Sequence, residues 1–274
     1  MSLSEEVKGY ALEMGADLAG IASTSEFDDA PIGHRPRDLL TDAKSVIVVA
    51  KKIPLSVVKT IPSPLYSTTY RILNEELRVL TYKISLFLEK QGYIALPIDP
   101  GISDFARDVD IIQEKPEPKI KMLGDFSHRH AAVKAGLAQF GLASYVVTKL
   151  YGPRIRFASL LCNAYLEPDE MIEEGSICNP ESCGYACVRA CPPGALRGDG
   201  TIDHYKCRNY REPELFTLEY FNDISELSKK ESNLIRRISI LSKKYSSRNS
   251  ETCGICIKAC PIGISIKKLN TRAR

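Results

Sequence analysis

The stretch Cys253-Gly254-Ile255-Cys256-Ile257-Lys258-Ala259-Cys260-Pro261 sets three thiols in the pattern C-x2-C-x3-C and follows them with a proline. A looser run upstream, Cys178-x4-Cys183-x3-Cys187-x3-Cys191, is also followed directly by a proline. Such spacings let one short loop supply several thiolates to a metal site, while the proline turns the chain away. The two runs predict a metal-binding C-terminal region.

Two [4Fe–4S] clusters account for these thiols. Where two such motifs occur, the cysteine before each proline ligates the other cluster, so the motifs interlock. One cluster then takes Cys178, Cys183, Cys187 and Cys260. The second takes Cys191, Cys253 and Cys256, and Cys207 completes it. Structural zinc is the alternative, because four-cysteine sites also bind Zn²⁺, but the interlocked sets and the twin Cys-Pro endings favour clusters.

Two further features concern single cysteines. The Cys183-x3-Cys187 spacing is one residue wider than usual. It indicates a distorted loop, a three-iron cluster or a different fourth ligand. Cys162 ends an apolar run and is expected to be a buried core residue.

Composition limits the class of protein. The 274 residues are 44% hydrophobic and 26% charged, as in ordinary globular proteins. No apolar run approaches the roughly 20 residues of a membrane span, and the first residues lack a secretory signal. We therefore expect a cytoplasmic protein with no membrane partner, in which nine cysteines indicate metal rather than disulfides. Residues 206–274 carry 15 Lys and Arg against 7 Asp and Glu. This excess suits a solvated helix face, and less readily an acidic electron donor or nucleic acid.

The cysteine distribution divides the chain into two domains, 1–165 and 166–274, because no cysteine precedes Cys162. Strands alternate with helices in the first domain, which predicts an α/β fold (or α+β). A cysteine-free helical insertion is predicted at about 209–250. A polar stretch at 100–118, with three prolines, is expected to be a site loop.

Hydrophobic patterning places the elements of the first domain. Expected helices run from Ser4 to Met14, from Tyr66 to Gln91 and from Ser127 to Leu137. Expected strands are 18–22, 45–50, 93–98 and 155–161, of which 45–50 is a continuous apolar run typical of a buried central strand. In the long helix, the expected core side is Ile72, Leu77, Leu80, Ile84, Phe87 and Leu88.

Several motifs resemble those of epoxyqueuosine reductase and, more distantly, of cobalamin-dependent reductive dehalogenases. They are residues 33–40 (Gly-His-Arg-Pro-Arg-Asp-Leu-Leu), the helix at 66–78, residues 131–137 (Ala-Ala-Val-Lys-Ala-Gly-Leu), residues 151–156 (Tyr-Gly-Pro-Arg-Ile-Arg) and the cysteine spacing from Cys191 onward. The resemblance implies a nitroreductase-like N-terminal domain that binds base-off cobalamin. It also implies a ferredoxin-like domain whose clusters reduce the cobalt, and an acidic proton donor.

The chain departs from this family at two positions. Alignment on residues 134–137 places Met122 where the family has its catalytic aspartate, and Gly141-Leu142 replaces the family's Gly-Lys pair. These differences favour a paralogue that acts on an unknown substrate other than tRNA.

The resemblance also directs attention to candidate site residues. Candidate proton donors are Asp125, His128 and His130, together with Tyr66 and Tyr70, which share one helix face. Candidate cofactor contacts are His34, Arg35, Arg37, Tyr66, Tyr70, Arg129, Ala132, Gly136 and Leu137. Helix capping, core packing and surface salt bridges are the structural alternatives for these residues.

The sequence therefore favours a corrinoid-dependent iron–sulfur reductase. It would take electrons from a low-potential donor such as a ferredoxin or flavodoxin. The alternative is a non-catalytic electron carrier or a reductive activator of a corrinoid protein. Flavin in place of the corrinoid also remains open. A wide cavity floored by the helix at 131–137 would favour the corrinoid enzyme, and a filled one the carrier.

Overall fold

A four-stranded antiparallel sheet forms the centre of the computed structural model, which describes residues 2–101, 125–211 and 253–264. Its strand order is β1 (Leu18–Ser23), β2 (Ser45–Lys52), β6 (Ile155–Cys162) and β3 (Ala95–Pro97). β2 and β6 pair over their full length, from Ser45 opposite Cys162 to Lys52 opposite Ile155. The mixed fold is thus confirmed, with antiparallel rather than parallel pairing, and the run at 45–50 is a buried central strand as predicted.

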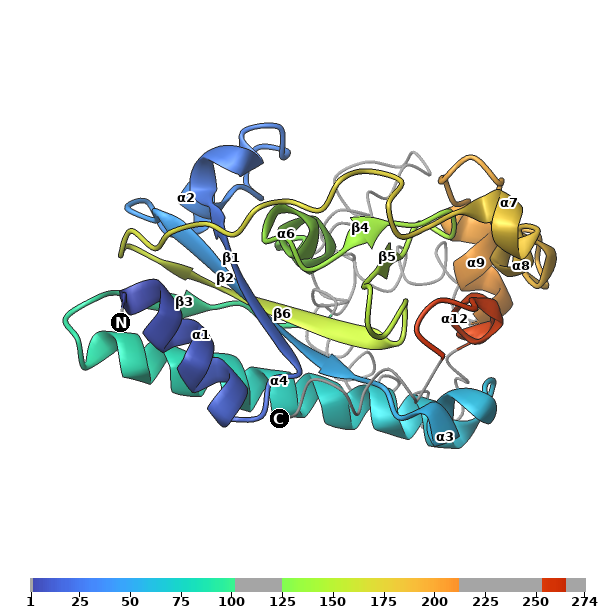
Figure 1. Ribbon diagram of the computed structural model, residues 1–274, viewed down its shortest axis with the longest axis horizontal. Helices are drawn as coiled ribbons and strands as arrows, with labels where there is room; N and C mark the ends of the chain where they lie inside the picture. Colours follow the sequence, from blue (N-terminus) through green and yellow to red (C-terminus); the bar gives the residue numbers. More distant parts are fainter. Residues whose placement is uncertain (1, 102–124, 212–252, 265–274) are drawn as a thin grey trace, which may run out of the picture.

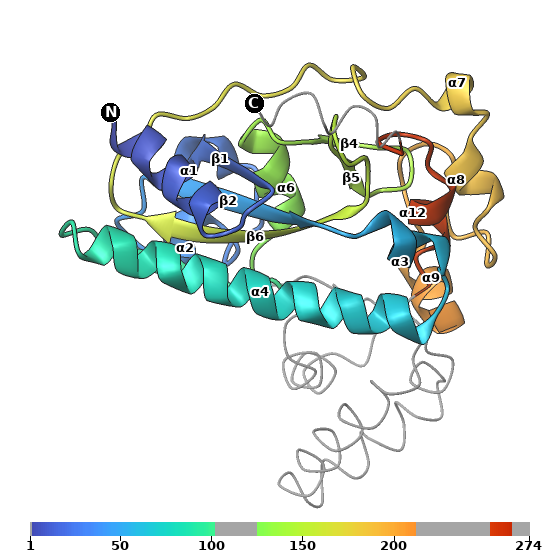
Figure 2. The same ribbon diagram turned by 60° about the horizontal axis from the view of Figure 1, so that its bottom comes forward.

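Helices cover both faces of this sheet. Figures 1 and 2 show α1 (Leu3–Glu13) and α4 (Pro64–Glu89) on one face and α6 (His128–Lys134) on the other. The alternation of side chains along each strand divides the core accordingly. On β2, Ile47 and Val49 join the α1–α4 core, whereas Val46 and Val48 join the α6 core.

The long helix α4 begins two residues before its predicted start. The Ser63 hydroxyl accepts a hydrogen bond from the Tyr66 N–H, and Pro64 occupies the first turn, where no N–H partner is needed. The buried face consists of Leu73, Leu77, Leu80, Ile84 and Leu88. The prediction for Ile72 was wrong: its side chain is 52% exposed, because Leu73 occupies the core-facing position one residue later.

Shorter elements complete the described chain. They are η1 (Thr24–Phe27), α2 (Pro36–Leu39), α3 (Leu55–Lys59), β4 (Gln139–Phe140), β5 (Val146–Val147), α7 (Pro180–Cys183), α8 (Ala186–Arg189), α9 (His204–Arg211) and α12 (Ile255–Ala259). The predicted helix at 127–137 ends at Lys134, because Gly136 turns the chain with a φ of +66°.

The segment after β6 stays attached to the sheet. The Asp169 carboxylate accepts a hydrogen bond from the Ile21 N–H at 2.9 Å and pairs with Lys8 at 2.6 Å. The predicted boundary at residue 165 therefore lies next to a segment that remains in contact with the first domain.

Parts of the prediction fall outside the described residues. They are Met122, nearly all of the polar loop and almost the whole insertion at 209–250. Of the helices that are described, none combines the length and apolar character that crossing a membrane demands.

Candidate functional site

Eight of the nine cysteines lie at one end of the sheet. The helices α7, α8, α9 and α12 gather there, beyond the end of β6 at which Ile155 lies and next to α3 and the first turn of α4 (Figure 1). Cys162 lies at the opposite end of β6 and is fully buried in the core, as predicted.

Four thiols from distant parts of the sequence form a first group. Burial raises the pKa of Cys187, and the Cys260 and Cys183 thiols raise it further. Burial likewise raises the pKa of Cys260, with added contributions from Cys178 and Cys183. Groups affect one another in this way only when they are close. The first group therefore has the membership of the first predicted ligand set.

A second group forms around Cys256. Burial raises the pKa of this thiol to about 12, and Cys253, Cys207 and Cys191 raise it further. These are the four cysteines of the second predicted set, including the isolated Cys207. Their role as ligands stays a prediction.

The surroundings of these thiols suit an iron–sulfur cluster. Backbone N–H groups face several of the sulfurs: that of Ala195 lies 3.3 Å from Cys191 Sγ, and those of Ile257 and Ile262 bond to the thiols of Cys256 and Cys260. Within the described ranges, no three Cys, His, Asp or Glu side chains stand close enough to hold one metal ion.

Two glycines bring the cysteine loop against the sheet. Gly152 and Gly263 both have positive φ, at +57° and +73°. A Cβ on Gly263 would lie 2.5 Å from the Gly152 nitrogen, and a Cβ on Gly152 would overlap the Ile262 carbonyl oxygen. This backbone-to-backbone contact fixes the loop after Cys260 next to the start of β6.

Arg154 lies behind this contact. Its side chain is only 1% exposed. One terminal nitrogen, Nη1, donates to the carbonyl oxygens of Cys260 at 2.9 Å and Ile257 at 3.3 Å. Burial lowers the pKa of Arg154, and Cys260 partly opposes this effect. Sequence reasoning missed Arg154 as a site residue.

Tyrosines on α4 connect the second group to the sheet. The Tyr66 ring packs on Gly254, between Cys253 and Cys256, where an added Cβ would lie 2.6 Å from the ring. Burial raises the pKa of the Tyr66 phenol strongly. The Tyr70 ring lies edge-on to that of Tyr66, with centroids 6.4 Å apart. The structure thus brings both predicted tyrosines close to the cysteine loop.

Arg156 extends this row and was also missed as a site residue. Its guanidinium carbon lies 3.9 Å from the centroid of the Tyr70 ring, so the cation rests on the aromatic face. Its nitrogens donate to Asn74 Oδ1 and to the Pro100 carbonyl oxygen. Its place in the quoted Tyr-Gly-Pro-Arg-Ile-Arg motif was the signal that could have found it.

His128 has both ring nitrogens engaged. Nε2 lies 2.8 Å from the Asp99 carbonyl oxygen and must donate to it, so Nδ1 accepts from the Ser159 hydroxyl at 3.0 Å. Burial, with repulsion from Arg156, lowers its pKa to about 4. The ring is thus neutral at neutral pH, both of its nitrogens are already paired, and burial is the main cause of the low pKa.

The low pKa of His128 predicts a loss of stability in acid. The unfolded chain protonates this ring near pH 6.5, whereas the folded protein does so near pH 4. The contribution is therefore complete above about pH 6.5 and is lost as the pH falls toward 4, by up to about 3 kcal/mol. Urea unfolding at pH 7 and pH 4.5 should show this loss, and His128→Gln should reduce it. An identical pH dependence in the variant would contradict the assignment.

The other proton-donor candidates lie around the start of α6. His130 Nδ1 lies 2.6 Å from the Ser127 hydroxyl, and its ring packs on Phe140. Burial lowers the pKa of His130, and Arg129 and Lys134 lower it further. Arg129 donates to the Ser144 carbonyl oxygen at 2.8 Å. Asp125 is exposed just before the helix.

The predicted basic loop sits at the other end of β2 from the cysteines. His34 Nδ1 lies 3.2 Å from the Asp125 carbonyl oxygen. Arg35 and Arg37 donate to the carbonyl oxygens of Ala30 and Ala43. The structure therefore brings His34 to Asp125, but not to the two groups of thiols.

The small-residue helix α6 faces the sheet. Ala132 is fully buried in the core on this side of the sheet. An added Cβ on Gly20 of β1 would lie 2.9 Å from the Leu137 side chain, and a Cβ on Gly136 would overlap the Glu170 carbonyl oxygen. Ala132, Gly136 and Leu137 thus pack closely against protein, and their role as cofactor contacts stays a prediction.

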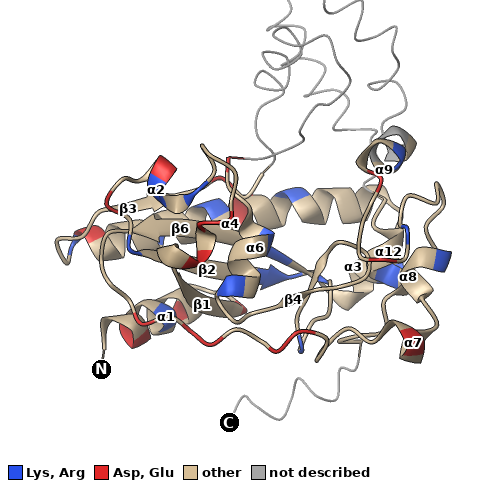
Figure 3. Ribbon diagram, turned by 90° about the horizontal axis from the view of Figure 1, so that it is seen from above, with Lys and Arg blue, Asp and Glu red and all other residues tan. Residues whose placement is uncertain are grey.

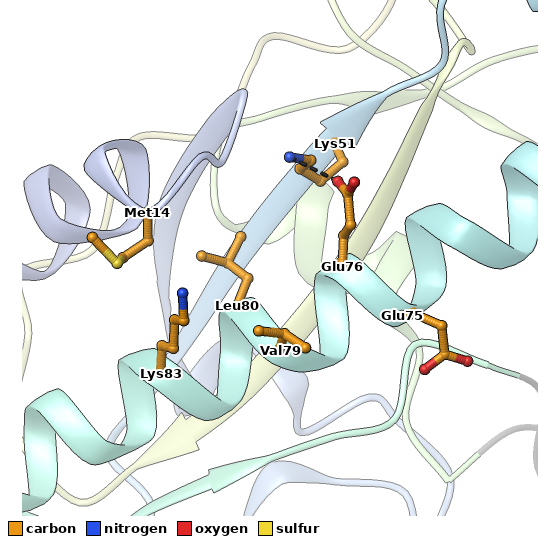
Figure 4. Close-up of a pocket in the computed structure, with 7 residues that line it drawn as sticks. All are labelled: Met14, Lys51, Glu75, Glu76, Val79, Leu80 and Lys83. Atoms are coloured by element: carbon orange, nitrogen blue, oxygen red, sulfur yellow. Dashed lines mark ion pairs between the residues drawn. The ribbon is translucent and has the colours of Figure 1, made fainter.

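A pocket of about 330 Å³ opens on the α1–α4 side (Figure 4). It is lined by Met14, Lys51, Glu75, Glu76, Val79, Leu80 and Lys83, and a Lys51–Glu76 ion pair of 2.9 Å crosses it. None of the predicted site residues lines this pocket.

Known proteins resemble this chain in sequence and in fold. A tetrachloroethene reductive dehalogenase of Desulfitobacterium hafniense is 30% identical over 175 residues, which are 62% of this chain and 26% of that protein. Epoxyqueuosine reductase of Bacillus anthracis is 24% identical over 231 residues, 75% of this chain and 55% of that protein. The chain is a distant homologue of epoxyqueuosine reductases and reductive dehalogenases. The low identity fits a paralogue. No protein-family model matches the chain.

Solved structures of these homologues show the same fold. Epoxyqueuosine reductase of Streptococcus thermophilus superimposes with a TM-score of 0.58 at 17% identity, over 97% of this chain and 67% of that one. A catabolic reductive dehalogenase gives a TM-score of 0.55 at 15% identity, over 90% of this chain and 37% of that one. This chain spans about a quarter of the length of the dehalogenase matched in sequence and about half of the Bacillus epoxyqueuosine reductase.

Proposed function

We propose that this homologue is an iron–sulfur oxidoreductase that passes electrons, one at a time, from a low-potential donor through two [4Fe–4S] clusters to an acceptor. The observation that supports this most is the grouping of eight half-buried thiols into two sets of four. One cluster would be held by Cys178, Cys183, Cys187 and Cys260, and the other by Cys191, Cys207, Cys253 and Cys256. The clusters supply one-electron storage at low potential.

The chain's own residues hold these groups in place. Thiolates, not thiols, bind metal. Burial raises the pKa of the Cys187, Cys256 and Cys260 thiols, so iron would release their protons on binding. The packing of the buried Tyr66 ring on Gly254 keeps the second set next to α4. Basic residues accompany the cysteine helices, as Figure 3 shows for α8 and α12, and would offset the negative charge of the clusters.

The electron acceptor would lie at the face between α4 and β6. Tyr70 and Arg156 lie there, next to the residues that contact the second set. Arg156, held by Asn74 and Pro100, presents a fixed positive charge to anything that receives an electron at this face. A ferredoxin or flavodoxin as electron donor stays a proposal, and no docking surface is assigned to it. The substrate class also stays open.

A corrinoid acceptor is the more specific form of this proposal. One reductive dehalogenase of similar fold, with a TM-score of 0.53, performs B12-dependent dehalogenation. A flat macrocycle needs an open floor, and the described face of α6 does not provide it, because the sheet and the 169–170 segment fill that space. This packing favours the second candidate function, an electron carrier or an activator of a corrinoid protein.

Cobalamin retention separates the two functions. The protein is reconstituted anaerobically with iron and sulfide, mixed with hydroxocobalamin and passed through a gel-filtration column. Base-off cobalamin retained at about one per chain, as a single specific site requires, would support the reductase. Full clusters without retained cobalamin would support the carrier, and flavin is then tested in the same way. Absence of cluster absorption and iron after reconstitution would refute both.

A further inference from the structure

Arg154 is the only fully buried charged side chain among the residues that the structure describes. Nη1 donates its two hydrogen bonds to the carbonyl oxygens of Cys260 and Ile257. Nε and Nη2, although buried, have no hydrogen-bond partner among the residues that the structure describes. A guanidinium stays protonated in proteins and carries five N–H donors. Three of those donors are therefore buried without an acceptor in the described part of the chain.

Unpaired buried donors on a cation are strongly unfavourable, and native proteins pair them with an anion or an acceptor. The Cys260 carbonyl oxygen already accepts from Nη1 at 2.9 Å, which places the guanidinium beside a predicted cluster ligand. A cluster with four thiolate ligands is a net anion, and its sulfurs accept hydrogen bonds. Its potential depends on that charge, on hydrogen bonds to the sulfurs and on exposure to solvent.

We propose that Arg154 is a positioning residue for the cluster held by Cys178, Cys183, Cys187 and Cys260, which it stabilises in the reduced state through N–H···S bonds and its positive charge. This inference rests on the proposed iron–sulfur function. In the step concerned, the oxidised cluster gains one electron from an external reductant, and no bond forms or breaks. The added negative charge lies beside a buried cation, so reduction becomes easier.

Arg189 provides a matched control. It lies in α8 between Cys187 and Cys191, with Nη1 3.0 Å from the place where a Cβ on Gly184 would be, but it is exposed. Solvent screens an exposed charge far more effectively than a buried one. Arg154→Gln and Arg189→Gln therefore remove the same group near the same cysteines, in buried and in exposed surroundings.

The test is an anaerobic redox titration of the reconstituted full chain, followed by low-temperature EPR. In Arg154→Gln, the reduction equilibrium of one cluster should shift about tenfold or more toward the oxidised state, which for one electron is about 59 mV. The other cluster should stay within about twofold, as should both clusters in Arg189→Gln. Arg154→Lys keeps the charge but not the several N–H donors of the guanidinium. The reduction equilibrium of its cluster should lie between those of the wild type and Arg154→Gln.

A second measurement applies even if Arg154→Gln fails to assemble. Wild-type protein labelled with ¹⁵N in its arginine guanidinium groups should show ¹⁵N coupling to the reduced cluster in pulsed EPR. This coupling should persist in Arg189→Gln. Two intact clusters without ¹⁵N coupling, or with unchanged potentials in folded Arg154→Gln, would overturn the role of Arg154 alone. A protein that assembles no cluster would overturn the proposed function as well.

Discussion

Replacing Cys207 with serine is expected to lower the iron content from about eight to about four atoms per chain. Cys207 lies sixteen residues after Cys191 and belongs to no short motif. Its thiol nevertheless acts on that of Cys256, together with Cys253 and Cys191. A serine hydroxyl is a poor substitute for a thiolate at a soft metal site. The second cluster should therefore be lost, while the first remains.

Iron analysis and EPR of the reduced protein measure this result. Two neighbouring reduced clusters interact magnetically, and the variant should show the simple signal of an isolated one. Cys162→Ala is the control, because Cys162 is buried in the core at the other end of β6 and should not change the iron content. Full iron in Cys207→Ser would show that another residue completes the second set.

Gly152→Ala is expected to destabilise the protein by about 3 kcal/mol or more. Alanine at a φ of +57° has a conformational penalty of about 1–2 kcal/mol. Its Cβ would also overlap the Ile262 carbonyl oxygen and lie 2.8 Å from Arg154 Nη2. Because the first of these contacts is to backbone, the loop after Cys260 must move away from the sheet. We expect a lower thermal midpoint together with faster loss of iron.

Gly194→Ala separates the contact from the conformational penalty. Gly194 has nearly the same φ, +60°, but an added Cβ would meet nothing within 4 Å. Its cost should be limited to about 1–2 kcal/mol. Equal shifts of the thermal midpoint in the two variants would show that the Gly152–Gly263 contact contributes nothing beyond backbone conformation.

Most of the central fold could be predicted from the sequence. The apolar run at 45–50 and the amphipathic pattern at 66–91 report burial directly, and both elements are present. Strand direction could not be predicted from this pattern. Alternation of helices and strands is typical of parallel sheets, but it does not determine which strands pair, and here all of the pairs in the central sheet are antiparallel. Ile72 shows the same limit at one position, since Ile72 and Leu73 fit a helical pattern equally well until packing selects Leu73.

The candidate site could be predicted from the sequence only in part. Spacing along the chain predicted both groups of cysteines, because cluster chemistry constrains that spacing. Arg154 and Arg156 were overlooked because their partners, Cys260 and Asn74, lie 106 and 82 residues away. Conversely, Ala132, Gly136 and Leu137 suggested a cofactor floor, although small residues serve equally well to bring a helix close to a sheet.

The alternation of β6 has a consequence for how this protein can change during evolution. Arg156 faces α4, where it meets Asn74, whereas Ser159, three residues on, faces α6 and bonds to His128. Inserting or deleting one residue between them would exchange the two faces for everything beyond that point. The number of residues along β6 is thus constrained separately from their identities, because it sets which side chains face α4 and which face α6. We expect orthologues to show no gaps between Gly152 and Cys162.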